Sequence, residues 1–70
     1  MRERLHLGID VGTASARAGL FDPSGARRGM GSATFPIWRP EEDFVEESSA
    51  AIWQAVCDAT RAAIAEARAR

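Results

Sequence analysis

The first half of the chain alternates apolar and polar positions with the period of two that is typical of β-strands. Large apolar residues stand at every second position from residue 5 to residue 9, and the alternation stops at Gly12. Two further runs follow, each bounded by turn-forming residues. The pattern predicts a half-buried first strand and two more, at about residues 5–10, 16–21 and 27–35.

The second and third strands are separated by Asp22-Pro23-Ser24-Gly25. Proline presets φ for the first central position of a turn, Asp22 can accept hydrogen bonds from its own backbone, and Gly25 tolerates the exit geometry. The third strand is therefore expected to return antiparallel. Its glycines, Gly29 and Gly31, weaken a strand interior, so they indicate either an edge position or the close approach of another backbone.

A helix is predicted for the second half, at about residues 49–67. Pro36 and Pro40 rule out a central strand between them, because each removes a hydrogen-bond donor. Acidic residues precede Ser48 and Ser49, either of which can cap the helix, and they favour its first turn through the macrodipole.

The helix is expected to cover the sheet with one apolar stripe, in which Trp53 is assigned to the core and Cys57 acts as a small apolar residue. The residues of this stripe are Ile52, Trp53, Val56, Cys57, Thr60, Ile64 and Ala67, opposite Gln54, Asp58, Arg61 and Arg68. Three antiparallel strands followed by one helix make an α/β or α+β unit.

Composition limits what this unit can be. With 70 residues, 46% of them hydrophobic, the chain can hold one globular unit. A core of that size seldom gives a folding stability of more than roughly 3–5 kcal/mol without a disulfide, a metal or a partner. The formal net charge of −1 gives no basic field to attract nucleic acid or an anionic membrane. The N-terminal apolar run is too short for a signal peptide or a membrane span, so a cytoplasmic location is expected, and the lone cysteine agrees with a reducing compartment.

The segment richest in candidate chemistry is the turn after the first strand. Asp10 ends that strand, and Gly12 lets the turn pass close to a ligand. The hydroxyls of Thr13 and Ser15 are hydrogen-bond donors in addition to the backbone N–H groups of the turn. Arg17 supplies a fixed positive charge. These groups can hold nucleotide phosphates, with Asp10 orienting hydrated Mg²⁺ through its waters.

The simpler interpretation is a hairpin turn with no ligand, because Asp and Gly are favoured in turns for backbone reasons alone. The segment contains neither a Gly-Lys-Ser/Thr phosphate loop nor a Gly-x-Gly-x-x-Gly turn, and no helix is predicted directly after it.

The run from Leu7 to Asp22, LGIDVGTASARAGLFD, resembles the first phosphate-binding hairpin of FGGY-family sugar kinases, which belong to the actin-like, ribonuclease-H-fold ATPases. The stretches Trp38-Arg39-Pro40 and 44–53 resemble the entry to that family's first helix, in the version of ribulokinase-type members. The resemblance covers nearly the whole chain.

This resemblance implies the N-terminal part of an ATP-dependent kinase that phosphorylates a small sugar or polyol, a ketopentose such as D-ribulose being the first choice. Asp10 then matches the acid on the metal and phosphate side, Gly12, Thr13 and Ser15 match the phosphate loop, and Arg17 matches a position that reaches the phosphates. Ala14 departs from members with a hydroxyl there. The catalytic base, most sugar contacts and the adenosine pocket lie outside this segment in the family, so the isolated chain is expected to be inactive.

The implied cofactors are ATP and Mg²⁺, and the implied partners are a sugar and the remainder of the kinase chain, with a homo-oligomer left open. Two other interpretations stay open: a nucleotide-binding hairpin of a chaperone or filament ATPase, and an assembly fragment without a nucleotide. His6 is interpreted as a surface or structural histidine, and the acidic run 41–47 as a solvated helix entry. Trp38 either covers the sheet or lines a cleft.

Overall fold

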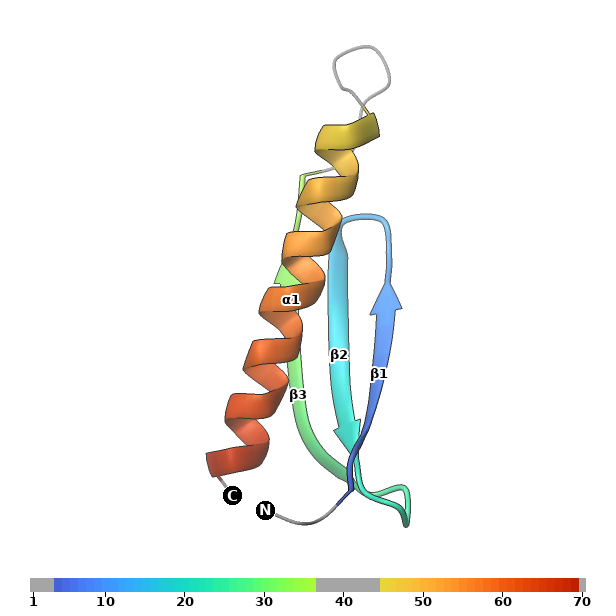
Figure 1. Ribbon diagram of the computed structural model, residues 1–70, viewed down its shortest axis with the longest axis vertical. Helices are drawn as coiled ribbons and strands as arrows, with labels where there is room; N and C mark the ends of the chain where they lie inside the picture. The colour runs from blue at the N-terminus through green and yellow to red at the C-terminus, as the bar shows by residue number, and fades with distance from the viewer. Residues whose placement is uncertain (1–3, 37–44, 70) are drawn as a thin grey trace.

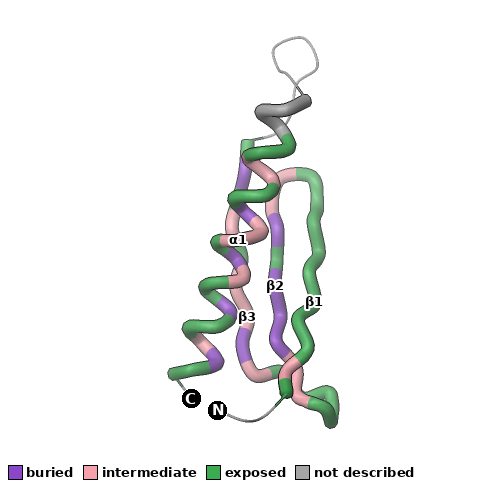
Figure 2. The backbone as a smooth tube through the Cα atoms, viewed as in Figure 1, coloured by how far each residue is buried: buried purple, intermediate pink, exposed green. Residues whose placement is uncertain are grey.

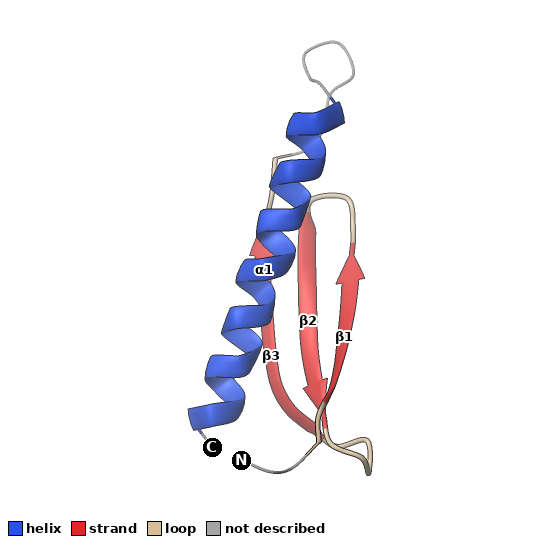
Figure 3. Cartoon of the chain, in the orientation of Figure 1, coloured by secondary structure: helices blue, strands red, loops and turns tan. Residues whose placement is uncertain are grey.

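The computed structural model describes residues 4–36 and 45–69. The described residues form a three-stranded antiparallel sheet with the strand order β1-β2-β3, and one helix lies along one face of it (Figure 1, Figure 3). The predicted order of three strands and one helix is confirmed. The elements are β1 (His6–Val11), β2 (Ser15–Phe21), β3 (Arg27–Thr34) and α1 (Val45–Ala69).

The helix begins four residues earlier than predicted. Ser48 and Ser49 lie inside α1 and do not cap it. The earlier start places residues 46 and 47 in the first turn of α1. Serine costs only a few tenths of a kcal/mol in a helix interior, so two serines do not end it.

The turn between β2 and β3 forms as predicted. The Gly25 N–H donates to the Asp22 carbonyl at 2.8 Å, and Gly25 has a φ of 92°, in the region that favours glycine. Asp22 Oδ1 accepts hydrogen bonds from the Ser24 N–H at 3.0 Å, the Ser24 hydroxyl at 2.7 Å and the Ala26 N–H at 3.0 Å. This side chain therefore fixes the turn that sets the β2–β3 register.

Small residues form the core between α1 and the sheet. On the sheet side Ala16, Ala18 and Leu20 of β2 are buried, and Figure 2 shows burial concentrated on β2 and on one side of the helix. The predicted stripe is confirmed in part: Ala67 is buried and Ile52 and Val56 are half-buried against the core, whereas Trp53 and Ile64 are exposed. The buried face of the helix consists of Ala55, Ala59, Ala63 and Ala67.

The alanine face follows from the two glycines of β3. A Cβ added at Gly31 would collide with the Ala59 carbonyl and lie 2.7 Å from the Ala63 nitrogen. At Gly29 it would collide with the Ala63 carbonyl and lie 2.9 Å from the Ala67 nitrogen. The helix backbone therefore lies directly on β3, which leaves no room for large side chains between them. Within the described residues β3 is an outer strand of the sheet and a helix backbone approaches it closely, so both alternatives given for these glycines are met.

Trp53 is 67% exposed and not part of the core, which corrects the prediction. Close contact through alanines leaves Trp53 and Ile64 at the exposed side of the helix. Cys57 is half-buried at the same side. β1 is exposed along its whole length, because α1 packs mainly on β2 and β3, so the prediction of a half-buried first strand is also wrong for this chain.

Trp38, its neighbours Arg39 and Pro40, and residues 41–44 of the acidic run lie outside the described residues, and so do the side chains of 45–48. His6 is exposed on β1, in agreement with the surface interpretation. Within the described residues, no helix combines the length and the apolar character that crossing a lipid bilayer requires.

Candidate functional site

The turn between β1 and β2 is short and anchored at both sides. The Gly12 N–H donates to the Ser15 carbonyl at 2.8 Å, which leaves Thr13 and Ala14 as the central residues. The Ala14 carbonyl accepts a hydrogen bond of 3.0 Å from the Phe35 N–H, just beyond β3. Phe35 is itself buried in a cluster with Ala16 and Ala55. The core thus holds the turn in place.

The turn presents donors outward. Within the described part of the chain, the backbone N–H groups of Thr13 and Ala14 and the hydroxyls of Thr13 and Ser15 have no hydrogen-bond partner. Thr13 is exposed, and Ala14 and Ser15 are half-buried. A rigid turn with several unpaired donors is what an oxyanion such as a phosphate requires.

Glycine at position 12 is not required by the turn itself. Its φ is not in the left-handed region, and an added Cβ would make an ordinary contact of 3.7 Å with the Ser15 carbonyl. The folded chain therefore tolerates a side chain at Gly12. The expectation that Gly12 serves the approach of a ligand is consistent with this geometry, since neither backbone strain nor packing accounts for a glycine at this position.

Asp10 and Arg17 stand directly opposite each other in the β1–β2 register, on the sheet face away from α1. An Arg17 guanidinium nitrogen lies 3.5 Å from Asp10 Oδ2, with the side chains 63% and 73% exposed respectively. An ion pair this exposed and this long contributes little to stability, at most about 1 kcal/mol. Both charged groups thus remain accessible to a ligand beside the turn.

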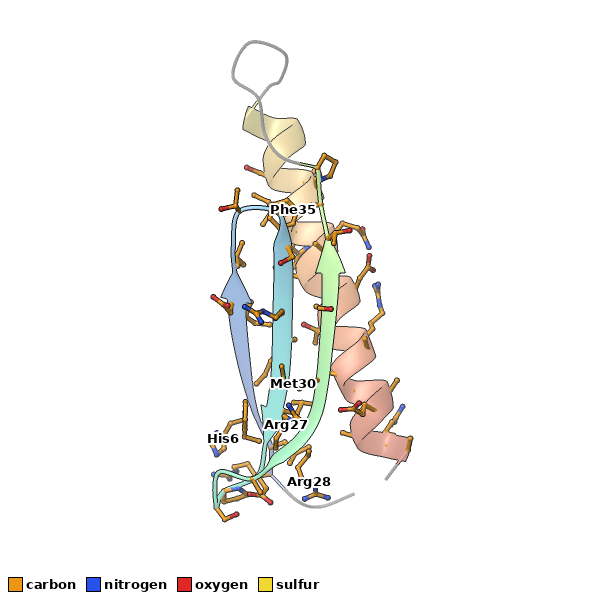
Figure 4. The ribbon with its side chains drawn as sticks, turned by 180° about the vertical axis from the view of Figure 1, so that it is seen from behind. His6, Arg27, Arg28, Met30 and Phe35 are labelled. Atoms are coloured by element: carbon orange, nitrogen blue, oxygen red, sulfur yellow. The ribbon has the colours of Figure 1, made fainter. Side chains whose placement is uncertain are left out.

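A shallow hollow of about 350 Å³ extends from this pair across the same face of the sheet. The ends of the Phe21 and Met30 side chains lie over Gly19, since an added Cβ there would be 2.8 Å from Phe21 Cε2 and 2.9 Å from Met30 Sδ. Figure 4 views the sheet from this side, with Met30 labelled on β3. The lining residues are Gly8, Ile9, Asp10, Arg17, Ala18, Gly19, Phe21 and Met30.

The sequence interpretation missed this hollow. The signal that could have found it is the register: Gly8 and Gly19 are paired across β1 and β2, and Met30 follows on β3. The two paired glycines contribute no side chains of their own to this face, which the alternation pattern of each strand alone does not reveal.

All five predicted site residues lie at one end of the β1–β2 hairpin. The structure brings Asp10 and Arg17 into contact and joins Gly12 to Ser15 through the backbone, with Thr13 between them at the tip. The hairpin therefore combines a carboxylate, a guanidinium, two hydroxyls and free backbone donors. This set of groups can bind a phosphate chain together with a hydrated divalent cation.

Comparison with known proteins adds an independent finding. A model of the N-terminal domain of the FGGY family of carbohydrate kinases matches residues 5–69. An FGGY carbohydrate kinase domain-containing protein from Xenopus laevis is 42% identical over 59 residues, which are 84% of this chain and 11% of that protein.

Two further relatives carry more specific names. A glycerol kinase from Bordetella pertussis is 40% identical over 61 residues, 87% of this chain and 12% of that enzyme. A D-ribulokinase from Saccharomyces cerevisiae is 40% identical over 65 residues, 90% of this chain and 9% of that enzyme. The chain thus spans about a tenth of the length of the curated relatives it matches.

Proposed function

This chain belongs to the FGGY family of carbohydrate kinases, and on that premise we propose that its β1–β2 hairpin binds the phosphate groups of ATP in a phosphoryl transfer to a small sugar. The observation that carries the proposal is the anchored turn of residues 12–15, whose N–H groups at Thr13 and Ala14 are unpaired beside the Asp10–Arg17 pair.

Each part of the hairpin has a role in this proposal. The N–H groups and hydroxyls of Thr13 and Ser15 donate to phosphate oxygens, and Gly12 lets those oxygens approach the backbone. Arg17 lies close enough to the turn to offset the negative charge of the phosphates. A single exposed carboxylate such as Asp10 suits Mg²⁺, which keeps several waters and binds through few protein groups. When bound, Mg²⁺ supplies positive charge against the β- and γ-phosphates.

The proposed reaction needs positioning and charge stabilisation more than covalent chemistry from the protein. A sugar hydroxyl oxygen bonds to the γ-phosphorus of ATP, the bond from that phosphorus to the β–γ bridging oxygen breaks, and the hydroxyl proton passes to a base. In this proposal the described residues bind the phosphate groups of ATP. The base, the sugar contacts and the adenosine pocket belong to the remainder of the kinase chain in this proposal, which also places the protein in the cytoplasm.

The relatives support a kinase over a non-kinase actin-like ATPase, because their names specify carbohydrate kinases, glycerol kinases and a D-ribulokinase. Identity does not separate the last two, at 40% each. We keep D-ribulose as the proposed acceptor because residues 44–53 resemble the ribulokinase type.

Amide chemical shifts of the ¹⁵N-labelled chain, recorded during titration with Mg²⁺–ATP and with Mg²⁺–tripolyphosphate, test the hairpin. We expect shifts at Thr13, Ala14 and Ser15 with either ligand, and weaker binding in Gly12→Ala, whose fold the structure predicts to be intact. The turn 22–25 serves as an internal control. Equal shifts at both turns, or none at Thr13, would contradict phosphate binding by the hairpin.

The acceptor is tested separately in the whole enzyme, with ADP release measured over a panel of pentuloses, polyols and hexoses. We expect the highest kcat/KM for D-ribulose. Activity confined to glycerol would overturn the ketopentose assignment and leave the phosphate hairpin in place.

A further inference from the structure

A hydrogen bond joins the β1–β2 turn to the residue that follows β3. The N–H of Phe35 donates to the Ala14 carbonyl at 3.0 Å. The last pair of the β2–β3 register is Ser15 with Thr34, so this bond carries the pairing one residue further, into the turn itself. The chain at the end of β3 therefore supports the turn of residues 12–15 on the side away from β1.

This bond fixes the orientation of one peptide group of the turn. The Ala14 carbonyl points toward Phe35, from which it accepts. The described residues contain no cis peptide bond, and the C=O and N–H of a trans peptide point in opposite directions. The N–H of Ser15, which belongs to the same peptide, therefore points away from β3. If this peptide rotated, a carbonyl oxygen would replace an N–H donor and would repel a phosphate oxygen.

The side chain of Phe35 is seated in the core beside the turn. It is 9% exposed and forms one buried cluster with Ala16 of β2 and Ala55 of α1. Among the described residues it is the only buried aromatic side chain. Figure 4 labels it at the end of the sheet where the β1–β2 turn lies. The ring thus links the position of its own N–H to both the sheet and the helix.

The position of this ring differs from that of the other residues that face α1 from the third strand. Every second residue of a strand lies on the same face, which places Gly29, Gly31, Ala33 and Phe35 together. At the two glycines the helix backbone lies directly on β3. Between residues 29 and 35 the one large side chain of this face therefore stands next to the turn, and not in the middle of the interface with the helix.

We propose that Phe35 is a positioning residue for phosphate binding. Its ring, seated between Ala16 and Ala55, holds its N–H on the Ala14 carbonyl and so keeps the donors of the turn directed at the phosphates of ATP. Phe35 does not touch the ligand and acts through Ala14. The inference rests on the proposed function, because the orientation of the turn matters for activity only if the turn binds phosphate.

Steady-state kinetics of the whole enzyme test the proposal with Phe35→Ala. We expect kcat/KM for ATP to fall roughly tenfold or more, because a small displacement of positioning groups is costly. KM for the sugar acceptor should change less than about twofold, since the turn makes no contact with the sugar in this proposal. Phe35→Leu keeps an apolar side chain of similar size, so it should bring kcat/KM for ATP back to within about threefold of the wild-type value.

Leu20→Ala is the matched control for a loss of core packing. Leu20 is 8% exposed, belongs to the other core cluster and lies near the opposite end of β2 from the turn. Its truncation should lower the melting temperature to a similar degree as Phe35→Ala. It should leave kcat/KM for ATP within about twofold of the wild-type value, because it does not support the turn.

Hydrogen exchange of the whole wild-type enzyme gives a second readout that needs no variant. Because binding and turn orientation are linked, a phosphate ligand that requires the bond to Ala14 must also stabilise it. We expect saturating Mg²⁺–ATP or Mg²⁺–tripolyphosphate to slow the exchange of the Phe35 amide roughly tenfold or more. The Gly25 amide, which donates to the Asp22 carbonyl in the other turn, should change less than about twofold.

The outcomes separate this inference from the proposed function, on which Asp10→Asn reports alone. If Asp10→Asn impairs the enzyme, three results would each overturn the role of Phe35 and leave phosphate binding in place. They are a normal kcat/KM for ATP in Phe35→Ala, an equal loss in Leu20→Ala, and exchange of the Phe35 amide that does not change with the phosphate ligands. Normal activity in both Asp10→Asn and Phe35→Ala would overturn the two proposals together. If Phe35→Ala does not fold, the exchange of the Phe35 amide decides.

Discussion

Asp22 shows how much local order one side chain can impose. Its carboxylate accepts from the Ser24 hydroxyl and from the Ala26 and Ser24 N–H groups, and Arg28 lies 3.7 Å away. The Ser24 hydroxyl, followed by the Ala26 N–H, holds the pKa of Asp22 below its ordinary value of 3.8. Ionised Asp22 therefore stabilises the fold. Only a side chain that accepts hydrogen bonds can take its place in the turn.

The first prediction concerns the pH dependence of this contribution. Because the folded pKa is lowered, the stabilisation is complete above the ordinary value and is lost as the pH falls through the folded pKa. Asp22→Asn should therefore be less stable than the wild-type chain near neutral pH and should approach it in strong acid. Urea unfolding of both proteins across the acid range measures this, and a stability difference independent of pH would contradict it.

At the scale of elements, the contact between α1 and β3 depends on glycine. In the second prediction, Gly31→Ala forces the new methyl group against the Ala59 carbonyl, a backbone atom that cannot rotate away. The helix must lift from the sheet, at a cost of about 1–3 kcal/mol. Gly12→Ala is the matched control, because its methyl group meets nothing closer than 3.7 Å. Urea unfolding that gives equal losses for the two variants would refute the account of the glycines.

The elements were predictable where local patterns decide them. The turn at Asp22-Pro23-Ser24-Gly25, the strand periodicity and the roles of Gly29 and Gly31 could all be inferred from residue types. The helix face could not, because periodicity identifies an apolar stripe but not the spacing between helix and sheet. The two glycines in β3 shorten that spacing, so alanines pack and Trp53 turns outward.

The residues of the candidate site could be predicted from the sequence, but the hollow beside them could not. Asp10, Gly12, Thr13, Ser15 and Arg17 were predicted from one contiguous run, and the structure places them at one end of a hairpin. The hollow beside them could not be predicted strand by strand, because it depends on the cross-strand pairing of Gly8 with Gly19 and on the positions of Phe21 and Met30.

At the scale of the whole molecule, the chain has a thin core. Among the described residues the buried hydrophobic ones are alanines except for Leu20 and Phe35, and no disulfide or cluster of metal ligands braces this part of the chain. The third prediction is therefore a marginal fold for the monomer, with a broad thermal transition below about 60 °C. Calorimetry at a concentration that keeps the chain monomeric tests it, and a sharp two-state transition above that temperature would contradict it.

Asp10 is the residue on which phosphate binding by the β1–β2 hairpin depends most. The fourth prediction is the effect of Asp10→Asn on kcat in the whole enzyme. The substitution keeps the shape and removes the charge that would orient the hydrated Mg²⁺. We expect kcat to fall roughly 10²–10³-fold, with a smaller loss for Thr13→Ala, whose backbone N–H remains. The melting temperature should hardly change, because the 3.5 Å pair with Arg17 is exposed. A nearly normal kcat in a less stable protein would make Asp10 a structural residue and remove the main support for a phosphate-binding hairpin.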